Sequence, residues 1–248
     1  MPIKSWIVGL AVLAGLIAAT GTASADAEEE KIALSLADLL RSARTVISSN
    51  QDLINDPSIG DKGLSGDVVV AQTLELYQKN TGMDPMQMDG ASRQGRFLRA
   101  QLAAIKEVMD ENQATVNQPG VDFKGFVPAV FARLVNERFG EIMGQEAEVK
   151  VTAPLELVRN RKSRPDKLEA DTIRTRFLAP DWPNGQILAV DAPKGGRDAF
   201  RVLVPEYYGQ GCLTCHGMPK GEVDITGYPK EGGQLGDLGG VISITLYR

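Results

Sequence analysis

The most reactive side chains of this chain lie close together near its C-terminus. The 248 residues include two cysteines and one histidine, and all three fall within the run Cys-Leu-Thr-Cys-His at 212–216. This C-x-x-C-H spacing is typical of covalent haem attachment. Two thiols three residues apart can reach the two vinyl groups of a haem, while the adjacent imidazole binds the iron. The motif predicts one covalent haem c, bound through Cys212 and Cys215 and ligated by His216.

Three other uses of these residues are open. A thioredoxin-like dithiol needs a C-x-x-C that follows an early strand and opens a helix in a βαβ unit. A structural zinc site needs four ligands, and only three are close in sequence here. A plain disulfide beside an incidental histidine would also satisfy the two thiols. The motif follows a late strand and precedes a glycine-rich run, which favours haem attachment over these alternatives.

The chain offers no second histidine and no spare cysteine as a sixth iron ligand, which leaves Met, Lys, Tyr, the N-terminal amine or water. Met83, Met86 and Met88 lie in a run whose Pro85 and Gly90 argue against regular structure. We predict Met88 as the sixth ligand, with Met86 next in order. The competing interpretation is that these methionines fill gaps in the apolar core. An empty sixth position would instead admit small gases.

Residues 1–25 have the order of a secretory signal peptide. Lys4 precedes an apolar run over residues 7–19, and small residues at 23–25 end the leader. We predict cleavage after Ala25 and export to the periplasm, with no stable membrane insertion afterwards. The apolar run is shorter than the roughly 20 residues of a spanning helix, so an uncleaved anchor is the less favoured alternative.

The composition is that of a folded, acidic protein. Hydrophobic residues make up 43% of the chain and charged residues 24%, which is unlike a disordered sequence. The formal net charge of -5 makes nucleic acid a poor partner. We expect a single haem-binding domain over residues 26–248 with a helical N-terminal extension. The sequence does not indicate an oligomeric state.

The apolar spacing predicts helices first and strands later. Apolar residues three and four apart predict a long helix from Ile32 that ends near residue 55. Further helices are expected at 67–79, 98–109, 126–139 and 165–177. Segments rich in branched residues predict strands at 148–152, 155–158, 186–190, 200–204 and 240–247. This order is typical of an α+β fold with a mostly antiparallel sheet.

The last expected strand alternates between apolar and polar residues. Its residues Ile242, Ile244 and Leu246 should share one buried face of the sheet. The alternate residues Ser243, Thr245 and Tyr247 should then lie on a more solvated face.

Several ordered segments carry a family resemblance. They read GFVPAVFARLVNERF at 125–139, RNRKSRPDKLE at 159–169, FRVLVP at 200–205, CLTCHG at 212–217 and DITGYPKEGGQLGDLGGVISI at 224–244. From Leu39 onward the chain resembles a family of c-type haem domains with a PAS-like fold, found as periplasmic proteins and as sensor domains of bacterial receptors. The resemblance implies a haem cradled by a curved antiparallel sheet with helices packed around it. The resemblance assigns a role only to Cys212, Cys215 and His216. In one relative a cysteine is the distal iron ligand, and this sequence has no further cysteine for that role.

Two further features could serve a haem. The basic cluster of Arg159, Arg161, Lys162, Arg164 and Lys167 could pair with haem propionates or dock an acidic partner, or it could be a solvated loop. The glycine-rich run at 227–240 could fold its backbone closely over one haem edge.

Two functions fit these features. One is electron transfer or redox sensing, which requires a separate redox partner or sensor partner. The alternative is a haem-based gas sensor that signals through another protein, since the last expected strand reaches the end of the sequence. Catalysis is not expected, because the only histidine is already used on iron.

Overall fold

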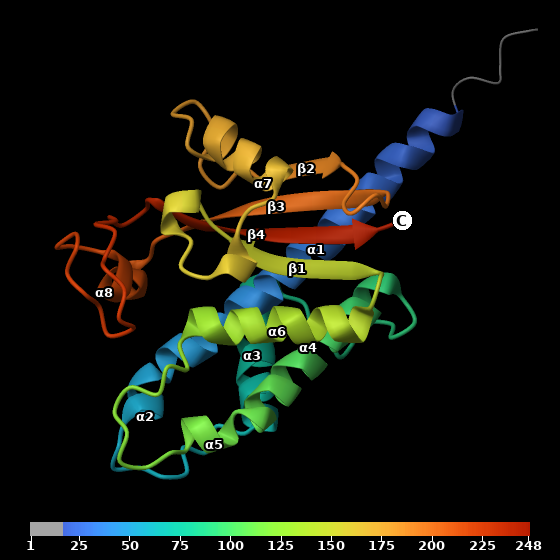
Figure 1. Ribbon diagram of the computed structural model, residues 1–248. Helices are drawn as coiled ribbons and strands as arrows, with labels where there is room; N and C mark the ends of the chain where they lie inside the picture. The colour runs from blue at the N-terminus through green and yellow to red at the C-terminus, as the bar shows by residue number, and fades with distance from the viewer. Residues whose placement is uncertain (1–16) are drawn as a thin grey trace, which may run out of the picture.

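The computed structural model describes the backbone of residues 17–248 and the side chains of residues 26–248. The first 16 residues of the predicted signal peptide therefore lie outside the described chain, and the leader stays a prediction. Within the described part, helices come first and a four-stranded antiparallel sheet follows (Figure 1). The fold is α+β, as predicted.

The helices lie close to their predicted positions. They are α1 (Ile17–Ser49), α2 (Gln51–Asn55), α3 (Gly66–Thr81), α4 (Arg93–Glu111), α5 (Gln113–Val116), α6 (Pro128–Met143), α7 (Lys167–Thr172) and α8 (Leu213–His216). Their starts follow local chemistry. The hydroxyl of Ser65 accepts from the backbone of Val68 at the start of α3, and Pro128 occupies the first turn of α6, where no backbone donor is needed.

The four strands form one sheet with the order β1-β4-β3-β2, and every neighbouring pair is antiparallel. They are β1 (Ala147–Thr152), β2 (Leu188–Asp191), β3 (Ala199–Tyr207) and β4 (Leu238–Tyr247). The central strands β3 and β4 run side by side over most of their length, with Tyr207 opposite Leu238. The chain leaves the sheet at the end of β3 and re-enters it at the start of β4, at the same end of the sheet. Residues 208–237 are therefore one connection between two neighbouring strands.

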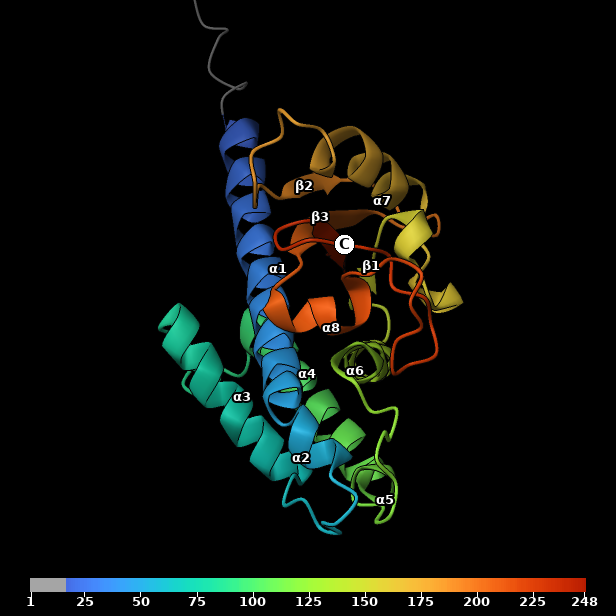
Figure 2. The ribbon, with the colours of Figure 1, turned by 90° about the vertical axis from the view of Figure 1, so that its left-hand side faces the viewer.

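Both faces of the sheet are covered. Helices α1 and α6 pack against one face, where residues such as Val202 and Ile244 join the main apolar core. Helix α4 packs against both of these helices, and α3 packs against α1 and α4. On the other face, Leu203 and Val241 pack against Ile173 and Phe177 of the π-helical turn η3 (Ile173–Phe177). Figure 2 shows α1 along one side of the sheet and α7 on the other.

This second cover corrects the expectation of a solvated face on the last strand. Ser243 is 2% exposed and Thr245 is 1% exposed, because α7 and η3 lie over them. The alternation of side chains on β4 is as predicted, but neither face is wet.

A second correction concerns residues 155–158, which were expected as a strand. The segment forms the 3-10 turn η1 (Leu155–Leu157), followed by a second such turn, η2 (Arg161–Ser163). Pro154 immediately precedes it and cannot donate a backbone hydrogen bond to a sheet. The side chain of Leu155 is exposed, so the branched residues here do not mark a sheet face.

Candidate functional site

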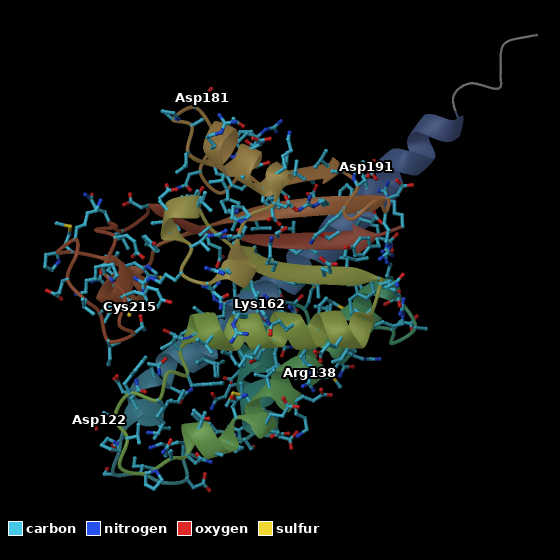
Figure 3. All side chains as sticks on the ribbon, in the orientation of Figure 1. Asp122, Arg138, Lys162, Asp181, Asp191 and Cys215 are labelled. Carbon is cyan, nitrogen blue, oxygen red and sulfur yellow. The ribbon has the colours of Figure 1, made fainter. Side chains whose placement is uncertain are left out.

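The C-x-x-C-H segment lies at one end of the sheet. After β3, the chain makes the 3-10 turn η4 (Gln210–Cys212) and then the four-residue helix α8, which ends at His216. A long irregular segment, residues 217–237, returns to β4 and is called the tail loop below. Figure 3 shows Cys215 at this end of the molecule, remote from Asp191 at the other end of the sheet. The helix α8 lies beside the C-terminal half of α1 (Figure 2).

The imidazole of His216 is held in place by two neighbours. Its Nδ1 lies 2.8 Å from Oε2 of Glu231, so Nδ1 donates to the carboxylate and Nε2 is left as the free nitrogen. The ring of Tyr208 stacks on the imidazole with centroids 5.1 Å apart and planes 17° apart. A histidine that binds a metal through one nitrogen commonly donates its other N–H to a carboxylate. The side chain is 28% exposed, so the site is half open.

Glu231 belongs to a larger charged network. Arg159 donates through Nε to Oε1 of Glu231 at 2.9 Å and through Nη2 to Oε2 at 3.1 Å, as a two-point contact. The same guanidinium donates to Asp224 at 2.6 Å and to the backbone oxygen of Cys215 at 2.9 Å. Arg159 thus ties two internal positions of the tail loop, Asp224 and Glu231, to α8.

The acids of this network are ionised in the folded state. Burial opposes the charge on Asp224, but hydrogen bonds from Thr226 and Arg159 hold its pKa well below the usual range. Burial likewise opposes the charge on Glu231, yet hydrogen bonds from Arg159 and His216 lower its pKa. Negative and positive side chains therefore alternate along this network, which ends at the imidazole of His216.

Two glycines press the backbone against Tyr208. A Cβ atom at Gly233 would lie 2.6 Å from the Tyr208 ring, and one at Gly239 would lie 2.3 Å from it, so neither position tolerates a larger residue without movement. Gly233 also donates its N–H to the backbone oxygen of His216 at 2.7 Å. Burial raises the pKa of Tyr208 to about 12. The glycine-rich run folds closely onto the ring that supports His216, and its contact with a haem edge stays a prediction.

The two thiols are free and half-buried, and they are not joined as a disulfide. Burial, and then the nearby carboxylate of Asp224, raise the pKa of the Cys215 thiol. A reactive dithiol of the thioredoxin type has a lowered thiol pKa and opens a helix of a βαβ unit. The Cys215 thiol shows the opposite direction, and the structural condition is not met, since α8 has four residues and the sheet is antiparallel. Within residues 26–248, no group of three or more His, Cys, Asp or Glu is arranged to hold a metal ion.

The predicted sixth ligand does not reach the site. The backbone oxygen of Met88 accepts from Arg99 of α4, and Arg93 at the start of that helix donates to the backbone oxygen of Tyr247. By contrast, Tyr208, whose ring stacks on His216, donates its backbone N–H to the backbone oxygen of Asp237, just before the other end of β4. Ten residues at about 3.3 Å each separate these two ends by about 30 Å.

Met88 and His216 are therefore at opposite ends of the sheet, and the prediction of Met88 as a ligand is corrected. Met83 and Met88 pack against the main core, as the competing interpretation held, while Met86 is exposed. The position of this segment follows from the packing of α3 and α4, which its irregular sequence does not reveal (Figure 1).

The residues of the basic cluster do not meet at one site but pair with different acids. Arg159 alone joins the network around His216, while Lys162 reaches Glu137 of α6 and Lys167 reaches Asp171. Sequence reasoning named Arg159 only as a cluster member and missed Glu231, Asp224 and Tyr208. Glu231 lies 15 residues beyond His216 in an irregular loop. No periodic pattern marks it.

Fold and site together define a class: an α+β protein that carries a C-x-x-C-H segment at one end of an antiparallel sheet, braced by a charged tail loop. Within that class, the chain belongs to the Tll0287-like family, whose profile matches residues 22–246. The matched range includes the C-x-x-C-H segment and the whole tail loop. Comparison with curated proteins and with solved structures found no match. None of the helices in the described chain is long and apolar enough to cross a membrane.

Proposed function

We propose that this chain is an exported protein that carries one covalent haem c and acts in electron transfer or redox sensing. The observation that carries the proposal is the arrangement of His216. Its Nδ1 is bound to Glu231, its Nε2 is free, and two unpaired thiols lie within one turn of it. This is the set of groups that haem attachment requires, and membership of the Tll0287-like family is consistent with it.

The chain's own residues have separate tasks in this proposal. Cys212 and Cys215 would hold the haem through two thioether bonds, each formed by addition of an S–H bond across a vinyl group. His216 would bind the iron through Nε2. The haem would supply a one-electron iron couple. The PAS-like character expected from the resemblance, the periplasmic location and the partner protein are parts of the same proposal.

The surroundings of the motif support exchange with a partner. Large apolar side chains of the tail loop are exposed next to the half-open site. Single exposed apolar residues are common on protein surfaces, but a concentration of them is typical of contact surfaces. They are Met218, Val223, Ile225, Tyr228 and Leu235. A redox partner protein would bring its own centre close to the haem by covering these residues.

The attachment is tested by mass. The chain is produced with its leader in a host that attaches haem to C-x-x-C-H proteins, and the intact mass of the purified product is measured. The wild-type protein should carry the mass of one haem, and the double variant Cys212→Ala with Cys215→Ala should carry none. Met88→Leu is the control and should keep the full adduct. A covalent adduct in the double variant, or none in the wild type, would contradict the proposal.

A haem-based gas sensor is the second candidate, and the location of the methionines favours it. Met109 and Met143 are buried in the helical core, and Met218 is exposed only two residues beyond His216. Together with the remote Met83, Met86 and Met88, these are all the methionines whose side chains are described, and none is placed to bind the opposite side of an iron held by His216. A Soret shift on adding carbon monoxide to the ferrous protein would support gas sensing. No shift would support a strong sixth ligand and electron transfer.

A further inference from the structure

The hydrogen-bond acceptor of His216 Nδ1 is a carboxylate rather than a neutral oxygen. Oε2 of Glu231 lies 2.8 Å from Nδ1, and the side chain of Glu231 is 17% exposed. A short contact to a charged acceptor is about twice as strong as one to a neutral acceptor. Because the proton on Nδ1 is drawn toward Glu231, the imidazole becomes a stronger electron donor at Nε2.

Arg159 acts on the same carboxylate from its other side. Both oxygens of Glu231 accept from its guanidinium, and Oε2 is shared between Arg159 and His216. The guanidinium draws charge away from the carboxylate and so weakens the pull of Glu231 on the imidazole proton. Arg159 is itself fixed by Asp224 and by the backbone of Cys215, so its position is set by the fold.

Glu231 and Arg159 have opposite effects on the electron density at Nε2 of His216. More negative charge at Glu231 makes His216 a better donor and favours ferric iron, whereas less charge favours ferrous iron. Tyr208, stacked on the imidazole, and the backbone contact from Gly233 fix the ring orientation that both effects need.

We propose that Glu231 is the positioning residue of the proximal histidine, and that the Arg159–Glu231 pair sets the preference of the bound iron for its ferric over its ferrous state. This inference rests on the proposed function, because it assigns a role to residues that surround the attached haem.

The decisive variant is Glu231→Gln, which keeps the shape of the side chain and removes its charge. Glu222→Gln is the matched control, since Glu222 lies in the same tail loop, is half exposed and pairs with Lys230 rather than with His216. Both variants remove one negative charge, but only Glu231→Gln changes the acceptor of the Nδ1 proton. The reduction potential is measured by spectroelectrochemistry on haem-loaded protein. The iron–histidine stretching band of the ferrous state is recorded by resonance Raman spectroscopy.

The expected result is a shift of the ferric-to-ferrous ratio by about tenfold toward ferrous in Glu231→Gln, a factor equal to the smallest usual loss of metal affinity when such an outer partner is removed. For a one-electron couple this corresponds to a potential about 59 mV higher. The stretching band should move to lower frequency. Glu222→Gln should change neither quantity by a comparable amount. Equal shifts in the two variants, or no shift in Glu231→Gln, would overturn the inference.

A second variant decides the matter if Glu231→Gln does not retain haem. Arg159→Lys keeps the charge but loses the two-point contact, so Glu231 should pull harder on the Nδ1 proton and the potential should fall. A fall supports the inference, while no change or a rise overturns it. The intact mass separates the two levels of the argument. Wild-type protein without a covalent adduct would refute the proposed function, whereas loaded protein with unmoved potentials would refute only the role of Glu231 and Arg159.

Discussion

The helical core and the tail loop are stabilised in different ways. The helices α1, α3, α4 and α6 and one face of the sheet share a continuous cluster of buried apolar side chains, which includes Leu36, Phe97 and Phe139. The tail loop leaves its large apolar side chains exposed and is held by Arg159, Asp224 and close glycine contacts. The comparison separates two tasks. Apolar burial stabilises the fold without directional requirements, whereas the charged network fixes the direction of one imidazole.

The largest expected effect comes from a cavity in the helical core. Phe139 is fully buried in α6, so Phe139→Ala should lower the free energy of unfolding by about 3–5 kcal/mol. Denaturant unfolding followed by circular dichroism measures this loss, and Phe139→Leu should lose much less. A loss below about 1 kcal/mol for the alanine variant would mean that this core is not the main source of stability.

A smaller and more local effect is expected where β4 meets Tyr208. The Cβ of Gly239→Ala would overlap the Tyr208 ring, at a cost of about 1–3 kcal/mol, and would push that ring away from His216. Gly209→Ala is the control, because Gly209 has a φ of -89° and no atom within 4 Å of an added Cβ. Hydrogen exchange should rise in the tail loop of the first variant only. Equal exchange in both variants would show that the contact does not brace the site.

The smallest effect is a dependence of the tail loop on pH. The pKa of Glu231 is lowered in the folded protein, and that of Asp224 is lowered further. Each carboxylate therefore contributes stability at pH values above its ordinary pKa, 4.5 for Glu231 and 3.8 for Asp224, and this contribution is lost as the pH falls through the lowered folded value.

Exchange of the amide of Gly233, corrected for its intrinsic pH dependence, should accelerate below about pH 4, while amides of α4 stay protected. Simultaneous loss of protection in both regions would remove the distinction between them.

Sequence reasoning succeeded where a local pattern decides the structure. The spacing from Ile32 onward defines the buried side of α1, and the strand-forming runs give four of the five predicted strands. The order of helices before strands was enough to predict the α+β class. The C-x-x-C-H segment is visible in the sequence because it occupies five consecutive residues, and its use for haem attachment stays a prediction.

Apart from the turn at residues 155–158, where Pro154 is a local cause, the failures depend on tertiary contacts. Ser243 and Thr245 are buried because η3 packs over their face of the sheet. Their alternation with isoleucine does not reveal this cover. Met88 was assigned to the iron because its segment is irregular, but irregularity carries no information about distance. Glu231 was missed for the opposite reason, since it lies close in space to His216 and has no periodic or motif signal in sequence.

The buried charges beneath α7 have a consequence for how this sequence can vary. The carboxylate of Glu169 is fully buried and accepts from Lys150, Arg201 and the backbone of Asp166, while Asp166 caps the same helix and also accepts from Arg201. Glu169 and Arg201 are buried while Lys150 and Asp166 are partly exposed, so removal of one member leaves unbalanced charge at a buried side chain, and the effects of substitutions at these residues should not add. Relatives of this chain should therefore exchange these four residues together or keep them together, and paired substitutions here would mark a change in how α7 is attached to the sheet.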